Sequence, residues 1–325
     1  MLLTFHLYGL IIKSLDLWFN FYKGIDLLER IFDYYIENLQ DGKTIRDYLK
    51  GKGFSTALLS RLKQHSRGIL LNGQRVFVNT LLVKGDRLEL LIEDENEFSE
   101  NILPFKGELN ILYEDEDMLV INKPPFLPVH PSKGHPYDCL ANIVAYYYAQ
   151  KGKKFVFRCV NRLDKDTSGV VVIAKNSFIH DALCQQSIMG QINKNYIAVV
   201  HGEVAPDKGT IDAPIYRPNI ATIKRIVSPL GQKAITHYEV ISKSNGLSIL
   251  KVKLETGRTH QIRVHFSYLG HPLVGDFLYG DENDGFLNRQ ALHCCSIALI
   301  HPITGQIIEF KTDLPEDMRD LTEIQ

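Results

Sequence analysis

Asn161-Arg162-Leu163-Asp164-Lys165-Asp166-Thr167-Ser168-Gly169 is a polar stretch of this 325-residue chain, and the apolar run 170–174 follows it directly. A short apolar run after a glycine predicts a buried strand, so the polar stretch becomes a loop between rigid elements, where functional groups concentrate. Asp164 lies close to two cations and should stay ionised, which suits a nucleophile and ill suits a general acid. From these residues alone, a plain turn in which Asp and Thr side chains bond the backbone is the favoured interpretation.

The segments around this loop mix helices and strands. Apolar residues at helical spacing predict helices over residues 138–150 and 177–188. Strands are predicted over residues 118–121, 196–200, 236–241 and 248–254, and Asn245-Gly246 forms the turn between the last two. Because the order lacks a regular strand-helix-strand rhythm, we expect an α+β fold with a largely antiparallel sheet.

A second polar segment, residues 255–266, reads Glu-Thr-Gly-Arg-Thr-His-Gln-Ile-Arg-Val-His-Phe. Thr259 is predicted to cap a helix that ends at Gly270. On that helix Arg263 lies beside His260 and could reach a carboxylate on a neighbouring loop. An exposed cationic helix face is the frequent alternative.

A third piece is the short motif Lys194-Asn195-Tyr196, which places a phenol hydroxyl at the mouth of a strand. The motif is weak by itself, since tyrosines in strands mostly serve packing. It gains weight only together with the other two segments.

Charge is unevenly distributed along the chain, although the formal net charge is only −1. Residues 42–92 hold ten basic and three acidic side chains, a local net charge of +7. Residues 93–117 hold ten acidic side chains and one basic, a local net charge of −9. This asymmetry favours a basic module that binds a polyanion, followed by an acidic linker, over a merely solvated basic surface.

The basic module has a readable layout. A helix is predicted over residues 43–52, and Ser55 is predicted to cap a second helix. Strands over 69–71 and 76–78 flank an Asn72-Gly73 turn, and residues 87–92 alternate like a strand. These fifty residues resemble the S4 RNA-binding domain, which implies contact with structured RNA through basic side chains of the helix pair: Lys43, Arg46, Arg61, Lys63 and Arg67.

Five segments in order resemble the RluA-type family of pseudouridine synthases, in particular the ribosomal large-subunit enzymes C and D. They are residues 115–131, the Arg-Leu-Asp loop, Lys194-Asn195-Tyr196, residues 256–263 and residues 270–276. The resemblance implies an α+β pseudouridine synthase core with a mixed, largely antiparallel sheet, preceded by the small S4-like α/β module. The implied boundaries are an N-terminal extension of no assigned function (1–30), the S4-like domain (31–93), an acidic linker (94–110) and the catalytic domain (111–325).

The resemblance also implies roles for individual residues. Asp164 matches the essential aspartate that attacks the target nucleoside, and Arg263 matches the arginine that pairs with it. Tyr196 matches the tyrosine that stacks on the uracil and helps to remove the C5 proton. Arg162 matches the arginine that fills the space left by the flipped base, and Ile262 matches an apolar wall of the uracil pocket. Thr167, Lys194 and His260 are also expected to bind substrate.

The implied activity is conversion of specific uridines to pseudouridine in structured RNA, with large-subunit ribosomal RNA favoured and tRNA as the alternative. The target base must leave its stack at a cost of a few kcal/mol, which phosphate contacts and an inserted arginine can offset. The reaction needs no metal, redox cofactor or second substrate, and the sequence has no phosphate-binding or dinucleotide-binding glycine motif. We expect a monomeric, cytoplasmic protein with RNA as its partner and no membrane association.

Asn161 departs from the family pattern, which usually has histidine before Arg-Leu-Asp. Asparagine can hydrogen-bond but cannot carry charge. We therefore expect altered support of the loop or an altered RNA contact, with catalysis retained.

Three other interpretations of the sequence are weaker. His293, Cys294, Cys295 and His301 suggest a zinc site, but the apolar residues among them favour a buried core strand. Asp164 and Asp166 could serve a glycosidase, yet the neighbouring cations would leave neither as an acid. A non-enzymatic S4-type RNA-binding factor with an inactive core would not need Asp164, Tyr196 and Arg263 together.

Overall fold

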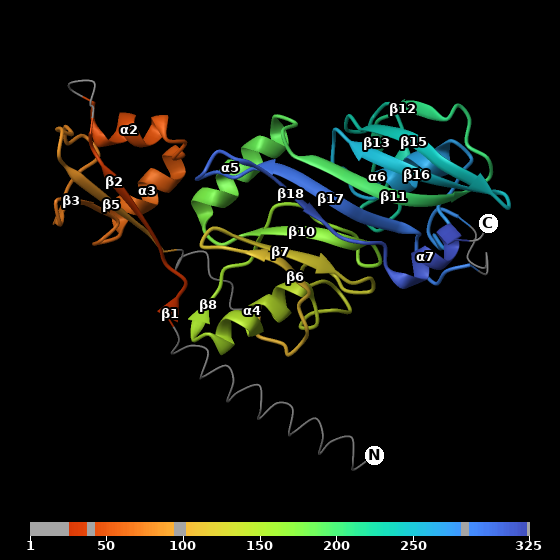
Figure 1. Cartoon of the computed structure of the whole chain (residues 1–325), viewed down its shortest axis with the longest axis horizontal. Coiled ribbons are helices and arrows are strands. Elements are labelled where there is room, and N and C mark those ends of the chain that lie inside the picture. The colour runs from red at the N-terminus through yellow and green to blue at the C-terminus, as the bar shows by residue number, and fades with distance from the viewer. Residues whose placement is uncertain (1–25, 38–42, 94–101, 281–285, 324–325) are drawn as a thin grey trace, which may run out of the picture.

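A computed structural model describes residues 26–37, 43–93, 102–280 and 286–323. Figure 1 shows a small N-terminal module at one end of the molecule and a longer domain built on one large sheet. The module contains β2 (Arg30–Tyr35), α2 (Ile45–Gly51), α3 (Thr56–Gln64), β3 (Ile69–Leu71), β4 (Gln74–Arg75) and β5 (Arg87–Ile92). Its four strands pair in the order β2-β5-β3-β4, and every pair is antiparallel.

Most predicted elements of this module are confirmed. The Ser55 hydroxyl accepts a hydrogen bond from Leu58 N and so caps α3 as expected. The strand predicted over 76–78 is wrong, because β4 is limited to residues 74 and 75. The turn residues Asn72 and Gly73 both have positive φ. This tight turn allows Gln74, directly after it, to pair with Leu71, directly before it. The strand β2 was not predicted.

The chain leaves the larger domain to form the module and then returns to it. Before the module, β1 (Asp26–Leu27) pairs in parallel with β8 (Lys153–Lys154), which follows α4 (Leu140–Gln150). After the module, Phe105 N donates to Asn142 O on α4, and the Asn142 side chain donates to Leu103 O. Residues 26–30 of the predicted extension thus form β1 and begin β2, while residues 1–25 lie outside the described residues.

Side-chain contacts also join the module to the larger domain, among them an ion pair and a ring stack. The Arg30 guanidinium donates to both carboxylate oxygens of Asp117, at 2.9 and 3.2 Å. The Phe54 ring stacks on Phe178 with 4.3 Å between centroids. The acidic charge of residues 114–117 therefore belongs to a hairpin of the larger domain, where Asp117 serves this ion pair.

The large sheet has ten strands. Eight form the path β12-β15-β16-β11-β17-β10-β7-β6, while β18 pairs with β17 and β9 with β10. Only the β10–β17 pair is parallel, so the predicted mixed, largely antiparallel sheet is confirmed. The strands are β6 (Ile111–Glu114), β7 (Met118–Lys123), β9 (Arg158–Cys159), β10 (Ser168–Ala174), β11 (Asn193–His201), β12 (Lys208–Asp212), β15 (Ile235–Ser244), β16 (Leu247–Leu254), β17 (Leu292–Ile300) and β18 (Ile307–Lys311).

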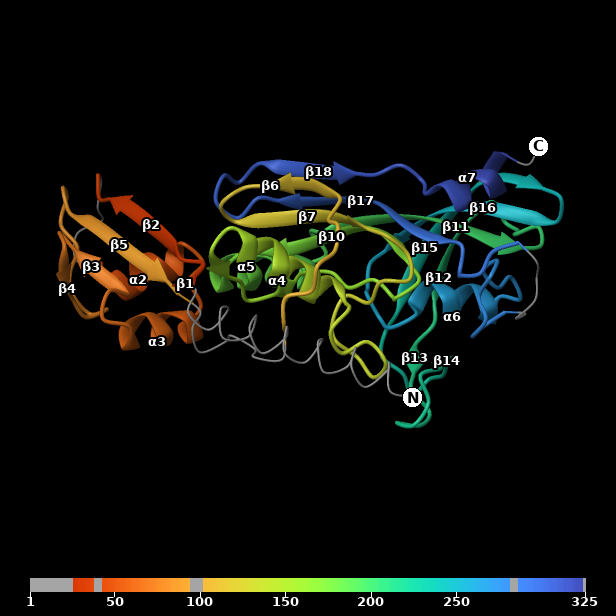
Figure 2. The same cartoon turned by 90° about the horizontal axis from the view of Figure 1, so that it is seen from below.

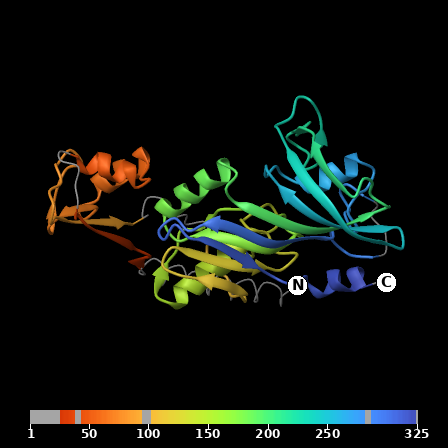
Figure 3. The same cartoon turned by 45° about the horizontal axis from the view of Figure 1, so that its top comes forward.

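Helices cover one face of this sheet. Figure 2 shows α4 and α5 (Ser177–Ile188) below the β6-β7-β10 half, and α6 (Gln261–Tyr268) on the same side of the other half. The hairpin β13 (Ile215–Tyr216) and β14 (Ile226–Val227) projects from this side, as Figure 3 also shows. The C-terminal helix is α7 (Glu316–Glu323). Within the described ranges, no helix is both long and apolar enough to cross a membrane.

The strand predicted from the opening stretch lies at the centre of the core. All seven residues of β10 are buried, because the strand is flanked by β7 and β17 and covered by helices. The predicted helix 177–188 coincides with α5, and the predicted core strand around Cys294 is β17. The loop before β10 is therefore attached to the most rigid part of the molecule.

Candidate active site

Residues 161–169, here called the Asp164 loop, follow β9 and include the first two residues of β10. Thr167 N donates to Asp164 O at 3.1 Å and closes a tight turn. Leu163 is buried beside Asp164, whereas the Asp164 side chain itself is 26% exposed. The turn thus holds a partly exposed carboxylate next to a buried leucine.

Asn161 fixes the start of this loop. Its Nδ2 donates to Val170 O at 3.0 Å, and its Oδ1 accepts from Val172 N at 2.8 Å, so the side chain pairs with β10 as a strand would. Asn161 is buried. Both polar atoms of this side chain are thus bonded to β10, which agrees with altered support of the loop, while the alternative of an altered RNA contact stays a prediction.

Arg263, on α6, connects two carboxylates. Its Nη1 donates to Asp164 Oδ2 at 3.1 Å, while Nε and Nη2 donate to the two oxygens of Asp276, both at 2.7 Å. The Arg263 side chain is 5% exposed and the Asp276 side chain is fully buried. Burial opposes the charge of the guanidinium, but Asp276 and Asp164 hold the pKa of Arg263 above its ordinary value. Sequence reasoning predicted the reach of Arg263 to a loop carboxylate and gave Asp276 no role.

Tyr196 reaches the same region from β11. Across the β11–β17 pair, Asn195 lies opposite Ser296 but Ile197 lies opposite His293, so β17 carries one extra residue at Cys294 and Cys295. Such a bulge redirects side chains locally. Burial raises the pKa of the Tyr196 hydroxyl well above its ordinary value, and Cys294 and Asp164 add to the rise. The phenol therefore keeps its proton at neutral pH.

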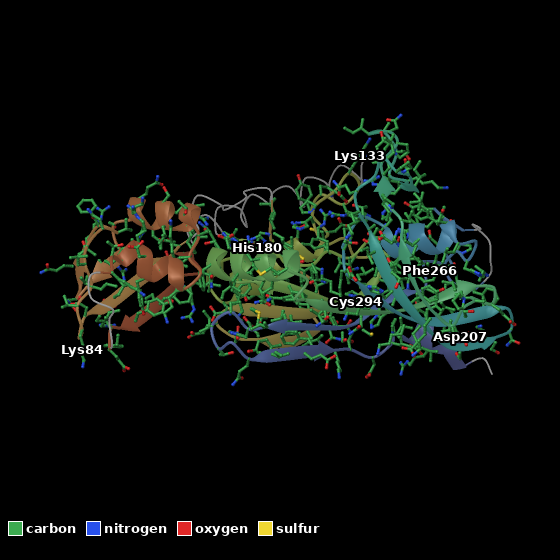
Figure 4. All side chains as sticks on the ribbon, turned by 90° about the horizontal axis from the view of Figure 1, so that it is seen from above. Lys84, Lys133, His180, Asp207, Phe266 and Cys294 are labelled. Atoms are coloured by element: carbon green, nitrogen blue, oxygen red, sulfur yellow. The ribbon has the colours of Figure 1, made fainter. Side chains whose placement is uncertain are left out.

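The bulge also brings β10 close to β17. Gly169, at the end of the Asp164 loop, has φ +118°, and a Cβ there would lie 2.2 Å from Cys294 O. Only glycine permits this approach. In Figure 4, Cys294 lies near the middle of the long sheet, between His180 on α5 and Phe266 on α6. The elements that carry Asp164, Tyr196 and Arg263 thus meet where the two halves of the domain join.

His260 occupies the position that Thr259 was predicted to take. It precedes α6 with φ +57° and makes no side-chain cap, so the prediction of a Thr259 cap is wrong. The Gln261 side chain explains the geometry: its Oε1 accepts from Arg258 N and from the Thr256 hydroxyl, which holds the preceding turn closed. A non-glycine residue at positive φ is unusual and is found where the surroundings fix it, often at functional sites.

The His260 ring lies between Asp164 and Tyr279. Its Nδ1 is 2.9 Å from the Tyr279 hydroxyl, and its Nε2 is 3.9 Å from Asp164 Oδ2. The Tyr279 oxygen also accepts a hydrogen bond from Arg225 N at 2.8 Å, so the tyrosine joins the His260 ring to the segment before β14. Burial lowers the pKa of His260 although Asp164 opposes the fall, so the ring is neutral at pH 7. Sequence reasoning missed Tyr279.

Replacing Tyr279 by phenylalanine should lower the free energy of unfolding by about 1–3 kcal/mol, because Arg225 N and His260 Nδ1 would lose their shared partner. Urea denaturation measures this change. The control is Tyr268→Phe on the exposed side of α6, which should change stability by less than about 0.5 kcal/mol. Equal free energies of unfolding for the two variants would show that the Tyr279 hydroxyl does not contribute to stability.

The other residues predicted to bind substrate differ in how far they are exposed to solvent. Ile262 is buried on α6 next to Arg263, and Arg162 is exposed next to Leu163. Lys194 is half-buried with its ammonium close to Gly257, and burial lowers its pKa. Thr167 is buried, and its hydroxyl accepts from Gln290 Nε2 at 3.0 Å, which suits support of the loop better than contact with a substrate.

Lys123, at the end of β7, supports the loop from below. It is fully buried, and its Nζ donates to the carbonyls of Pro124, Leu127 and Lys165, each at 2.9 Å. Burial lowers the pKa of Lys123 to about 7, against the opposing effect of Asp166 and Asp164. Supplying three donors requires the ammonium form, so this support depends on its charge.

The two histidines of the zinc interpretation have structural partners. His293 Nδ1 is 2.9 Å from the Ser168 hydroxyl, and His301 Nε2 is 2.9 Å from an Asp115 oxygen. In the N-terminal module, Arg61 is half-buried, while the remaining predicted RNA contacts are exposed: Lys43, Arg46, Lys63 and Arg67.

Comparison with known proteins adds independent information. Residues 117–268, which include Asp164, Tyr196 and Arg263, match the family model described as RNA pseudouridylate synthase. The RNA pseudouridine synthase YjbO of Bacillus subtilis is 42% identical over 278 residues, which cover 86% of this chain and 98% of that protein. Ribosomal large subunit pseudouridine synthase D of Escherichia coli O157:H7 is 34% identical over 314 residues, covering 89% and 95%. The solved structure of human RNA pseudouridylate synthase domain containing 1 is 26% identical, with a TM-score of 0.53 over 64% of this chain and 84% of that one.

Proposed function

The chain belongs to the RNA pseudouridylate synthase family, and from this membership we propose that it uses Asp164 to isomerise uridines flipped out of large-subunit ribosomal RNA. As an RNA pseudouridine synthase it is an isomerase: the bond from ribose C1′ to N1 of uracil is exchanged for a bond to C5, and the C5 proton is released. N1 takes up a proton in exchange, so the composition of the nucleotide is unchanged.

The contact between Arg263 and Asp164 is the observation that carries the proposal. Arg263 Nη1 donates to Asp164 Oδ2 at 3.1 Å, while the 26% exposure of the Asp164 side chain leaves it accessible to a nucleotide. Asp276 holds the guanidinium from the far side, so Asp164 meets a fixed positive charge. A carboxylate held in this way serves equally for attack on C1′ and for assisting the departure of uracil.

Tyr196 is proposed to stack on the displaced uracil. Its raised pKa keeps the phenol neutral at pH 7. It can therefore accept the C5 proton only if it gives up its hydroxyl proton to another group. Ile262, buried one residue before Arg263, is proposed as the apolar wall of the same pocket. An aromatic ring and an aliphatic side chain suit the two faces of a flipped base.

Arg162 is proposed to fill the space that the base leaves. It is exposed and stands two residues before Asp164, so it can enter the RNA stack while the carboxylate faces the ribose. Unstacking costs a few kcal/mol, which this insertion and phosphate contacts would offset.

The N-terminal module is proposed to bind the same RNA through its exposed cations. Alanine at Arg46 and Lys63, one from each helix, should raise KM for RNA about tenfold with kcat unchanged. The slope of log Kd against log salt concentration should fall by about 1.5–2, as expected for two lost phosphate contacts. The control removes Lys208 and Lys243, which pair with Glu239 and Asp207 at the opposite end of the molecule. An equal effect of both pairs would contradict a specific role of the module.

The choice of RNA is supported by relatives that are named large-subunit ribosomal enzymes. Tritium release from C5-labelled uridine tests it, with transcripts of large-subunit ribosomal RNA and of tRNA offered separately. Release from the ribosomal transcripts is expected, and pseudouridine mapping in a deletion strain then gives the position. Release from tRNA alone would replace the proposed substrate. A folded wild-type protein without release on any cellular RNA would favour the inactive S4-type factor.

A further inference from the structure

Arg289 is a fully buried arginine directly before β17. Its Nη1 donates to Asp166 O at 3.2 Å, in the Asp164 loop, and also lies 3.2 Å from Gln290 O and 3.4 Å from Leu292 O. A guanidinium that shares one nitrogen among three carbonyls needs a strong partner for its remaining donors. That partner is outside the loop.

Asp317, on α7, is the partner. Its two oxygens accept from Arg289 Nε at 2.7 Å and from Nη2 at 2.9 Å, a bidentate pair that fixes the plane of the guanidinium. Burial opposes the charge of Asp317, but Arg289 holds the pKa of this carboxyl below its ordinary value. Met318 and Leu321 of α7 are buried, so the helix provides a fixed anchor. A residue near the C-terminus is thereby connected to the loop that carries Asp164.

The contacts continue along the segment after Arg289. Gln290 Nε2 donates to the Thr167 hydroxyl at 3.0 Å, and His293 bonds the Ser168 hydroxyl at 2.9 Å. Three consecutive residues of the Asp164 loop, 166 to 168, are thus held by residues 289–293. Within this segment, Arg289 differs because the orientation of its guanidinium depends on the carboxylate of Asp317 on α7.

Asp166 shows what Asp317 prevents. Its Oδ1 is buried and has no hydrogen-bond partner in the part of the chain that the structure describes. A guanidinium released by Asp317 would still contact Asp166 O, in the same residue as this unpartnered carboxylate oxygen. Turning toward Asp166 would pull on the turn whose first residue is Asp164, since Thr167 N is bonded to Asp164 O.

We propose that Asp317 is a positioning residue for catalysis, because it holds Arg289 on the Asp166 carbonyl and so keeps Asp164 in register with Arg263. This rests on the proposed function of Asp164. A shift of about 1 Å in a reacting group costs roughly 10²-fold in rate, so a residue that acts only through the loop should change kcat and leave RNA binding intact.

The test compares Asp317→Asn with Glu316→Gln in the full-length protein. Both remove one negative charge from the same turn of α7, but Glu316 is exposed. Asp317→Asn should lower kcat for tritium release about 10²-fold with KM for the RNA transcript unchanged, while Glu316→Gln should match the wild type in both. Asp317→Glu, which restores the charge but displaces the carboxylate, should have a kcat about tenfold higher than that of Asp317→Asn and about tenfold below the wild type.

Hydrogen exchange supplies a measurement that does not depend on activity. The amide of Thr167 should exchange faster in Asp317→Asn than in Glu316→Gln, because the turn at Asp164 is loosened. Wild-type kcat together with unchanged Thr167 exchange in a folded Asp317→Asn would overturn the positioning role. If this variant melts below the assay temperature, the same two measurements on Asp317→Glu decide, with an approximately tenfold loss of kcat expected from the displaced carboxylate and wild-type values overturning the role. Failure of the proposed function is a separate result, since the wild-type protein would then release no tritium.

Discussion

Asp164→Asn is expected to lower the rate of pseudouridine formation by about 10⁴-fold or more, with the fold unchanged. The amide has the shape of the carboxylate but lacks the charge and the nucleophilic oxygen pair. Arg263 would remain bound to Asp276, and the turn hydrogen bond from Thr167 N uses the backbone of residue 164, so the loop keeps its support. Single-turnover tritium release measures the rate, and urea denaturation checks the fold.

Asp166→Asn is the matched control for this substitution. It makes the same change in the same loop, two residues further along, and should keep the rate within about tenfold of the wild type. A loss as large as that of Asp164→Asn would indicate a mechanism with two carboxylates, as in a glycosidase, and would contradict the assignment of Asp164 as the single acting carboxylate.

Arg263→Lys should lower kcat by about 10²–10³-fold and destabilise the protein by about 3–5 kcal/mol. Arginine reaches Asp276 with two nitrogens and Asp164 with a third, all in one plane. A lysine ammonium is a point charge and cannot keep that geometry toward both carboxylates. Because Asp276 is fully buried, an imperfect partner for it is costly.

Arg258→Lys controls for the loss of any guanidinium from this segment. Arg258 is exposed and its guanidinium donates to Lys233 O, while the bond from its backbone N–H to Gln261 does not depend on the side chain, so both stability and kcat should stay close to wild type. Rapid-quench kinetics and urea denaturation apply to both variants. A wild-type kcat for Arg263→Lys would mean that charge alone, without the planar geometry, holds Asp164.

Local sequence patterns were sufficient to predict those helices and strands whose own residues carry the signal. β10 and α5 could be predicted because a buried apolar run and a helical stripe carry their own signal. From the residues alone, Arg263 could be expected only to reach a carboxylate on a neighbouring loop, and the resemblance to a family implied that this carboxylate is Asp164. The resemblance to a family then gave these residues a common site.

The missed residues depend on tertiary contacts that the sequence does not display. Asp276 and Tyr279 lie in a loop after α6, where Gly and Pro neighbours indicate only a turn; their role comes from facing Arg263 and His260 in space. The prediction that Thr259 caps α6 was wrong for a related reason. The Gln261 side chain closes the preceding turn, and His260 takes a left-handed backbone conformation there. The general preference for threonine at helix caps gives no sign of this contact.

The pairing of β1 with β8 has a consequence for synthesis of the chain. Residues 26 and 27 leave the ribosome before the module that follows them, but their partners, residues 153 and 154, come only after that module and α4. At 5–20 residues per second, the first strand waits on the order of ten seconds for its partner. The module can complete its own four-stranded sheet during that time, since all of its pairings are internal. Closure of β1 on β8 then marks the moment at which the nascent N-terminus becomes part of the larger domain.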